Sequence, residues 1–110
     1  MDCMNISGAA RNYMAKYFNE EDFLIHVSKT IERQLLEWDD SYKVMIMKLE
    51  NYLWTARNGI NDYELELSEN EIKVLQKKEP YALDRKIWNE LQKQGLTILN
   101  GDGNYLDQIF

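Results

Sequence analysis

Apolar side chains recur at three- and four-residue steps through residues 41–58, and this stretch dominates the hydrophobic pattern of the chain. Such spacing places side chains along one face of a helix. A second, narrower stripe of Met47 and Trp54 makes the stretch apolar on two sides, which is typical of a helix covered on two sides. The pattern therefore predicts a central core helix. Its main face would consist of Tyr42, Met45, Ile46, Leu49, Tyr52, Leu53 and Ala56.

The same periodicity extends backward through residues 20–38, so the sequence leaves open whether residues 20–58 form one helix or two. The Asp-Asp-Ser sequence at 39–41 favours a break, because these residues are better caps than helix interiors. The apolar steps nevertheless continue across the break with the alternation of a coiled-coil seam. One long helix would favour a homodimer through the 31–56 seam.

Capping residues mark the starts of further helices. Ser7 and Asn19 are suited to cap two helices ahead of the central stretch. Ser68 and Glu71 form the pattern of a capping box at the start of a helix over 69–78. Another helix, over 83–94, would end at the glycine that follows it.

Two shorter segments read as extended structure. Residues 63–67 alternate apolar and acidic side chains, which suits a short strand or an extended connector. Residues 97–106 carry Asn-Gly between apolar runs, a strong signal of a β-hairpin. The Asn-Gly at 58–59 is instead interpreted as a helix stop.

These elements together predict a mainly α fold. We expect a single domain over residues 1–110, built as a bundle of four to five helices with a short C-terminal β-hairpin, and an α+β arrangement stays open. The front helices would cover about 7–58, and a helix-turn-helix plus hairpin would cover about 68–106. A chain of 110 residues is long enough to bury its own core.

The composition of the chain indicates in which cellular compartment the protein is expected. No apolar run approaches the ~20 residues needed to cross a bilayer, so no membrane association is expected. The first residues lack the basic and apolar blocks of a secretory signal. The lone cysteine, Cys3, cannot form an internal disulfide, which fits a reducing compartment. The sequence therefore predicts a cytoplasmic protein.

Candidate chemistry is sparse. His26 is the only histidine and Cys3 the only cysteine, and neither has a sequence context that indicates an activated nucleophile. Asn100, Asp102 and Asn104 have the spacing of the first ligands in an EF-hand loop, but the required glycine and bidentate glutamate are missing, so a turn is favoured. We therefore expect no catalytic activity, no metal and no cofactor.

Charge is uneven along the chain and gives the leading functional hypothesis. The formal net charge is −6, and residues 1–71 hold 7 Lys/Arg against 14 Asp/Glu. The sequence favours a non-catalytic, acidic protein–protein interaction module, such as a small inhibitor, immunity or regulatory protein acting on a basic partner. The candidate partner-binding residues are Glu20, Glu21, Asp22, Glu37, Asp39, Asp40, Asp62, Glu64 and Glu66.

A second hypothesis concerns the C-terminal third. The predicted order of two helices and a hairpin over 68–106 matches a winged-helix unit, which would make the protein a nucleic-acid-binding transcription regulator. The residues available for phosphate and base contacts are Lys73, Lys77, Lys78, Arg85, Lys86, Asn89, Gln92 and Lys93. The overall negative charge argues against this alternative.

Overall fold

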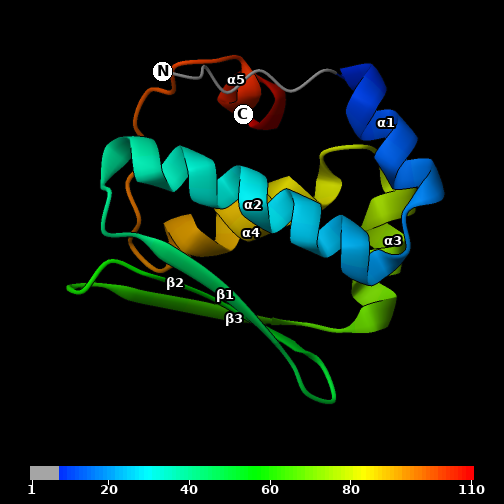
Figure 1. Ribbon diagram of the computed structural model, residues 1–110, viewed down its shortest axis with the longest axis horizontal. Coiled ribbons are helices and arrows are strands. Elements are labelled where there is room, and N and C mark those ends of the chain that lie inside the picture. The colour runs from blue at the N-terminus through cyan, green and yellow to red at the C-terminus, as the bar shows by residue number, and fades with distance from the viewer. Residues whose placement is uncertain (1–7) are drawn as a thin grey trace.

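The computed structural model describes residues 8–110, which contain five helices and three strands (Figure 1). In chain order these are α1 (Gly8–Tyr17), α2 (Glu20–Trp38), β1 (Lys43–Lys48), β2 (Tyr52–Arg57), β3 (Asp62–Leu67), α3 (Glu69–Lys78), α4 (Ala82–Lys93) and α5 (Tyr105–Ile109). The predictions that fall on Cys3 and Ser7 lie outside the described residues.

The strands form one antiparallel sheet in the order β1-β2-β3, and helices α2 and α4 lie across one of its faces (Figure 1). Alternate residues of β2 and β3 point into the layer between sheet and helices, where Tyr52, Trp54 and Leu67 are fully buried or nearly so. Trp54 also donates its indole N–H to Ser28 Oγ of α2 at 2.9 Å. No described helix covers the opposite face of the sheet.

The prediction of a central helix over 41–58 is wrong, because this stretch forms the β1–β2 hairpin. Each of its two apolar stripes mixes residues from both faces of short strands: in β2, buried Trp54 and Ala56 alternate with half-exposed Leu53 and Thr55. Helix α2 ends at Trp38, so no continuous helix follows the 31–56 seam. The helical-bundle prediction fails with it.

The predicted C-terminal hairpin is also wrong. Residues 97–104 form no strand, and the chain closes with helix α5. The Asn-Gly pair that does turn a hairpin is at 58–59, between β2 and β3, where Gly59 has a φ of +88°. The fold is therefore a set of helices around a central three-stranded antiparallel sheet.

The capping signals located the helices around the sheet correctly. Asn19 Oδ1 accepts the backbone N–H of Asp22 at 2.8 Å and begins α2, and Ser68 Oγ accepts that of Glu71 at 3.0 Å and begins α3. The predicted bounds of α3 agree with the structure, and those of α4 differ by one residue at each end. Residues 63–67, for which the pattern left open a short strand or an extended connector, lie in strand β3. Within residues 8–110, none of the helices combines the length and apolar character that crossing a bilayer requires.

Candidate functional site

The outer face of the sheet changes from apolar on β1 to acidic on β3. Strand register places Met45 of β1 beside Thr55 of β2 and Glu64 of β3, and the next row is Met47, Leu53 and Glu66. Both methionines are 52 % exposed. Three neighbouring strands thus present a strip of apolar side chains next to a row of carboxylates.

The carboxylates of this row differ in their partners. Asp62 forms an exposed ion pair with Arg57 at 3.5 Å, and Glu66 Oε2 accepts the side-chain amide of Asn51 at 2.6 Å. Within residues 8–110, the Glu64 carboxylate has neither a hydrogen bond nor an ion pair. Glu64 therefore carries an uncompensated negative charge in the middle of the row.

The predicted acidic residues at 37–40 hold loops together at the C-terminal end of α2. Asp39 accepts from both the backbone and the hydroxyl of Ser41, which lowers the pKa of its carboxyl, and it also accepts from Asn58 Nδ2. Glu37 Oε1 accepts the backbone N–H of Asp102 at 2.9 Å. Asp40, which follows Asp39, is exposed.

The predicted acidic residues at 20–22 lie at the opposite end of α2. A helix of 19 residues is about 28 Å long, so these carboxylates are remote from those at 37–40. They occupy the first turn, where the helix dipole stabilises negative charge. The structure therefore brings together Asp62, Glu64 and Glu66 but does not join the three predicted acidic groups into one surface.

Most of the basic residues predicted for nucleic-acid binding are paired with acidic neighbours. Arg85 forms an ion pair with Glu79 at 3.0 Å and donates to two backbone carbonyls of α5. The other pairs are Lys73 with Glu69, Lys86 with Glu71 and Glu90, and Lys93 with Glu90.

The remaining residues of the nucleic-acid hypothesis are dispersed. Lys77 and Lys78 line a cleft of about 780 Å³ beside α1 and α3, whereas Asn89 and Gln92 are exposed on α4. The hairpin that would serve as the wing does not exist. The structure therefore gives the winged-helix alternative no support.

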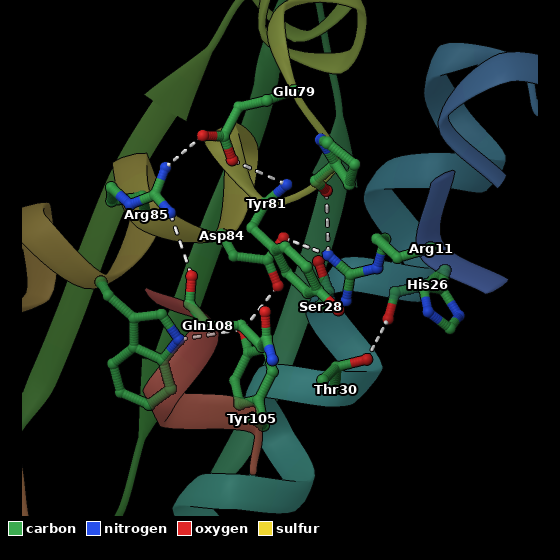
Figure 2. Close-up of polar contacts among 12 residues, drawn as sticks. Arg11, His26, Ser28, Thr30, Glu79, Tyr81, Asp84, Arg85, Tyr105 and Gln108 are labelled. Carbon is green, nitrogen blue, oxygen red and sulfur yellow. Dashed lines mark hydrogen bonds and ion pairs between the residues drawn. The ribbon is translucent and has the colours of Figure 1, made fainter. Parts of the chain in front are cut away.

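A buried polar cluster joins α1, α4 and α5, and the sequence analysis missed it (Figure 2). The Arg11 guanidinium donates to Asp84 Oδ1, and it also donates to the carbonyl of Pro80 at 3.3 Å. Tyr105 donates its hydroxyl to Asp84 Oδ2 at 2.5 Å and accepts the indole N–H of Trp88 at 3.0 Å. Arg11, Asp84, Trp88 and Tyr105 are all fully buried.

Burial controls the protonation of this cluster. It raises the pKa of the Asp84 carboxyl, against the opposing effect of the Arg11 charge. It also raises the pKa of Tyr105 well above 10, and the nearby Asp84 charge adds to this effect. Because these side chains have no contact with solvent, we interpret the cluster as a structural contact that holds helices α1, α4 and α5 together. The available signal was that Arg11 and Asp84 fall on the apolar faces of their helices, where charged residues are almost always paired.

Comparison with known proteins adds no family to this description. No protein-family model, curated protein or solved structure matches the chain. Within residues 8–110, no group of three or more His, Cys, Asp and Glu side chains is arranged to hold a metal ion.

Proposed function

We propose that this protein is a non-catalytic binding protein whose sheet engages a basic partner protein through its outer face. The observation that carries the proposal is the row of Asp62, Glu64 and Glu66 beside exposed apolar side chains, on a sheet face that no described helix covers. A partner of matching chemistry would present Lys or Arg side chains next to an apolar patch. A small inhibitor, immunity protein or regulator of a basic protein would act in this way.

The apolar part of the face supports contact rather than long-range attraction alone. Interfaces combine a desolvated apolar centre with a polar rim, and Leu53 of β2 lies directly beside Glu66, with Met45 and Met47 one strand further away on β1. Methionine side chains are flexible and adapt to different partner surfaces. The face therefore offers both area to bury and charge to orient the partner.

The net charge supports the same choice of partner. A formal charge of −6 repels nucleic acid and speeds the encounter with a basic protein. We also propose a cytoplasmic location, because a lone cysteine suits a reducing compartment.

The proposal is tested by placing a photo-crosslinking amino acid at Thr55, in the middle of the face, in cells that make the protein. We expect a covalent adduct with a basic protein. The captured protein, once purified, should bind the Glu64→Lys/Glu66→Lys variant at least about tenfold more weakly than the unchanged chain, because like charges at an interface are repulsive.

The matched control is Asp102→Lys/Asp107→Lys, which makes the same change in net charge at exposed positions away from this face. Equal weakening by both double variants would show that only net charge matters and would overturn the proposed face. No adduct at Thr55 above the yield from a crosslinker at Asp107 would overturn it as well.

A further inference from the structure

The two edges of the sheet differ in whether their backbone groups are free to pair with another strand, and those of the β3 edge are occupied at Glu64. Gln94, just after α4, accepts the backbone N–H of Glu64 at 3.1 Å and donates its amide to the carbonyl of the same residue at 2.8 Å. One side chain thus makes the pair of hydrogen bonds that a residue of a fourth strand would make. A further strand cannot pair with β3 at this position without displacing Gln94.

The β1 edge is largely open. Its backbone N–H at Val44 donates to Glu32 Oε2 at 2.8 Å, away from β2. Because hydrogen-bonding direction alternates along an antiparallel strand, the backbone groups of Ile46 and Lys48 point the same way. Among residues 8–110, no group bonds to the N–H of Ile46. Such an edge is a template for another strand.

Hollows lie next to this open edge. Two cavities of about 180 and 290 Å³ lie between α2 and β1, and Ile25 and Ile46 line both of them. An added strand would direct alternate side chains toward this groove and the others toward Met45 and Met47 on the outer face. The edge can therefore receive side chains on both faces of an added strand.

We propose that the occupant is a second copy of this chain, whose β1 pairs antiparallel with this β1 about a two-fold axis at Ile46. The two three-stranded sheets then form one continuous six-stranded sheet. In this register Ile46 faces the partner's Ile46, and Val44 faces the partner's Lys48. The outward backbone groups at 44, 46 and 48 are symmetric about the axis, so each N–H meets a carbonyl once the Glu32 carboxylate releases the N–H of Val44.

Charge complementarity selects this occupant and this register. The Glu32 carboxylate lies next to the backbone of Val44, which faces the partner's Lys48 in this register. The ammonium of the partner's Lys48 therefore comes beside the Glu32 carboxylate, and the two-fold axis repeats the contact. Lys48 is exposed on its own subunit, where its ammonium lies 4.1 Å from the ring centroid of Tyr52. Moving the axis to Met47 would instead set Val44 and its Glu32 opposite the partner's Glu50, a contact between like charges.

The apolar side chains on the outer face of the sheet also fit the proposed pairing of the two β1 strands. With the axis at Ile46, Met45 lies directly opposite the partner's Met47, so four half-exposed methionines come together at the centre of the extended sheet. The carboxylates of Glu64 and Glu66 remain on the distant strand β3. The interface therefore shares Met45 and Met47 with the binding face proposed above but not its carboxylates, so charge reversal at Glu32 and Lys48 tests the pairing separately from charge reversal at Glu64 and Glu66.

The test is the mass of the full chain by sedimentation equilibrium from low micromolar to near-millimolar concentration. We expect a reversible dimer. Glu32→Lys and Lys48→Glu should each weaken the dimer at least about tenfold, because each creates two repulsive contacts. The double variant Glu32→Lys/Lys48→Glu should restore it, since the exchanged charges attract again. Rescue of this kind requires that the two side chains meet across the interface.

The matched control for Lys48→Glu is Lys78→Glu, which reverses an exposed lysine on α3 and should leave the dimer unchanged. Circular dichroism of every variant establishes that it is folded. A monomer at all concentrations would overturn the proposal. A dimer that is indifferent to both single variants, or is not restored by the double variant, would overturn the β1 pairing.

Discussion

Two Arg–Asp pairs of the same chemistry lie in opposite surroundings. Arg11 and Asp84 join α1 to α4 with both side chains fully buried, whereas Arg57 and Asp62 pair on the outer face of the sheet with side chains 59 % and 74 % exposed. The buried pair has Tyr105 as an additional partner of the carboxylate, and the exposed pair lies beside the unpaired Glu64. The helical layer encloses its ion pair, in which only Nη1 of the Arg11 guanidinium has hydrogen-bond partners among the described residues, and the sheet layer leaves its charges to solvent.

The difference separates stability from binding. A buried ion pair that loses one member leaves an uncompensated charge in a medium that solvates it poorly, so its integrity is a condition of folding. An exposed pair contributes little to stability because water screens it, and its charges stay available to a partner. Variants in the two layers should accordingly change different measurements.

The largest effect is expected for Asp84→Ala. Removing the carboxylate strands the Arg11 guanidinium in the core and leaves the Tyr105 hydroxyl without its acceptor, which should lower the free energy of unfolding by about 3–5 kcal/mol. Urea unfolding measures the loss. The matched control, Asp62→Ala, should change the free energy of unfolding by no more than about 0.5 kcal/mol. Similar losses for both variants would remove the distinction between the layers.

A smaller effect is expected from the half-buried His26 of α2. Burial first, and then the positive charges of Arg11, Lys29 and Arg33, lower the pKa of His26 to about 4. The folded protein therefore holds the imidazole neutral to about pH 4, whereas the unfolded chain binds a proton near pH 6.5. The stability that this neutral ring contributes is complete above pH 6.5 and is lost as the pH falls toward 4.

The amount lost should be about 1–2 kcal/mol, because the half-exposed ring is partly screened by solvent. Urea unfolding at several pH values between 4 and 7 measures it, and His26→Gln should remove this part of the pH dependence. Titration of the other groups is common to both proteins and cancels in the difference. Parallel stability–pH curves for the two proteins would contradict the prediction.

The starts of α2 and α3 were predictable from the sequence because their signals are local. Asn19 and Ser68 cap helices within a few residues of themselves, whereas the apolar period after Asn19 did not show that α2 ends at Trp38. The hairpin over 43–57 was not recognised, because both of its strands are short and carry apolar residues on both faces. Its turn at 49–51, Leu-Glu-Asn, has neither Gly nor Pro to mark it. The same Asn-Gly dipeptide then served as a false hairpin signal at 100–101 and went unrecognised as a turn at 58–59.

The candidate sites likewise differ in whether a local sequence pattern could predict them. Asp62, Glu64 and Glu66 alternate within one strand, so their common face follows from the local pattern alone. The contact between Arg11 and Asp84 spans 73 residues of chain, and no local pattern can pair residues at that separation. The closure of β3 by Gln94 likewise depends on how α4 packs beside the sheet, which a sequence read element by element does not specify.

The smallest effect is expected for Gln94→Ala, which would make the β3 edge resemble the open β1 edge. The variant loses two exposed, neutral hydrogen bonds, so the free energy of unfolding should fall by only about 1 kcal/mol. The sharper measurement is amide hydrogen exchange at Glu64, whose N–H loses its acceptor and should exchange at least about tenfold faster. The amides of Tyr63 and Leu65 point toward β2 and should keep their protection. The control is Gln92→Ala, which changes an exposed glutamine of α4 two residues before Gln94. It should leave the exchange rates of all three amides unchanged. If Glu64 stays protected in Gln94→Ala, then something other than this side chain closes the edge, and the contrast between the two edges no longer explains why only β1 is free to pair.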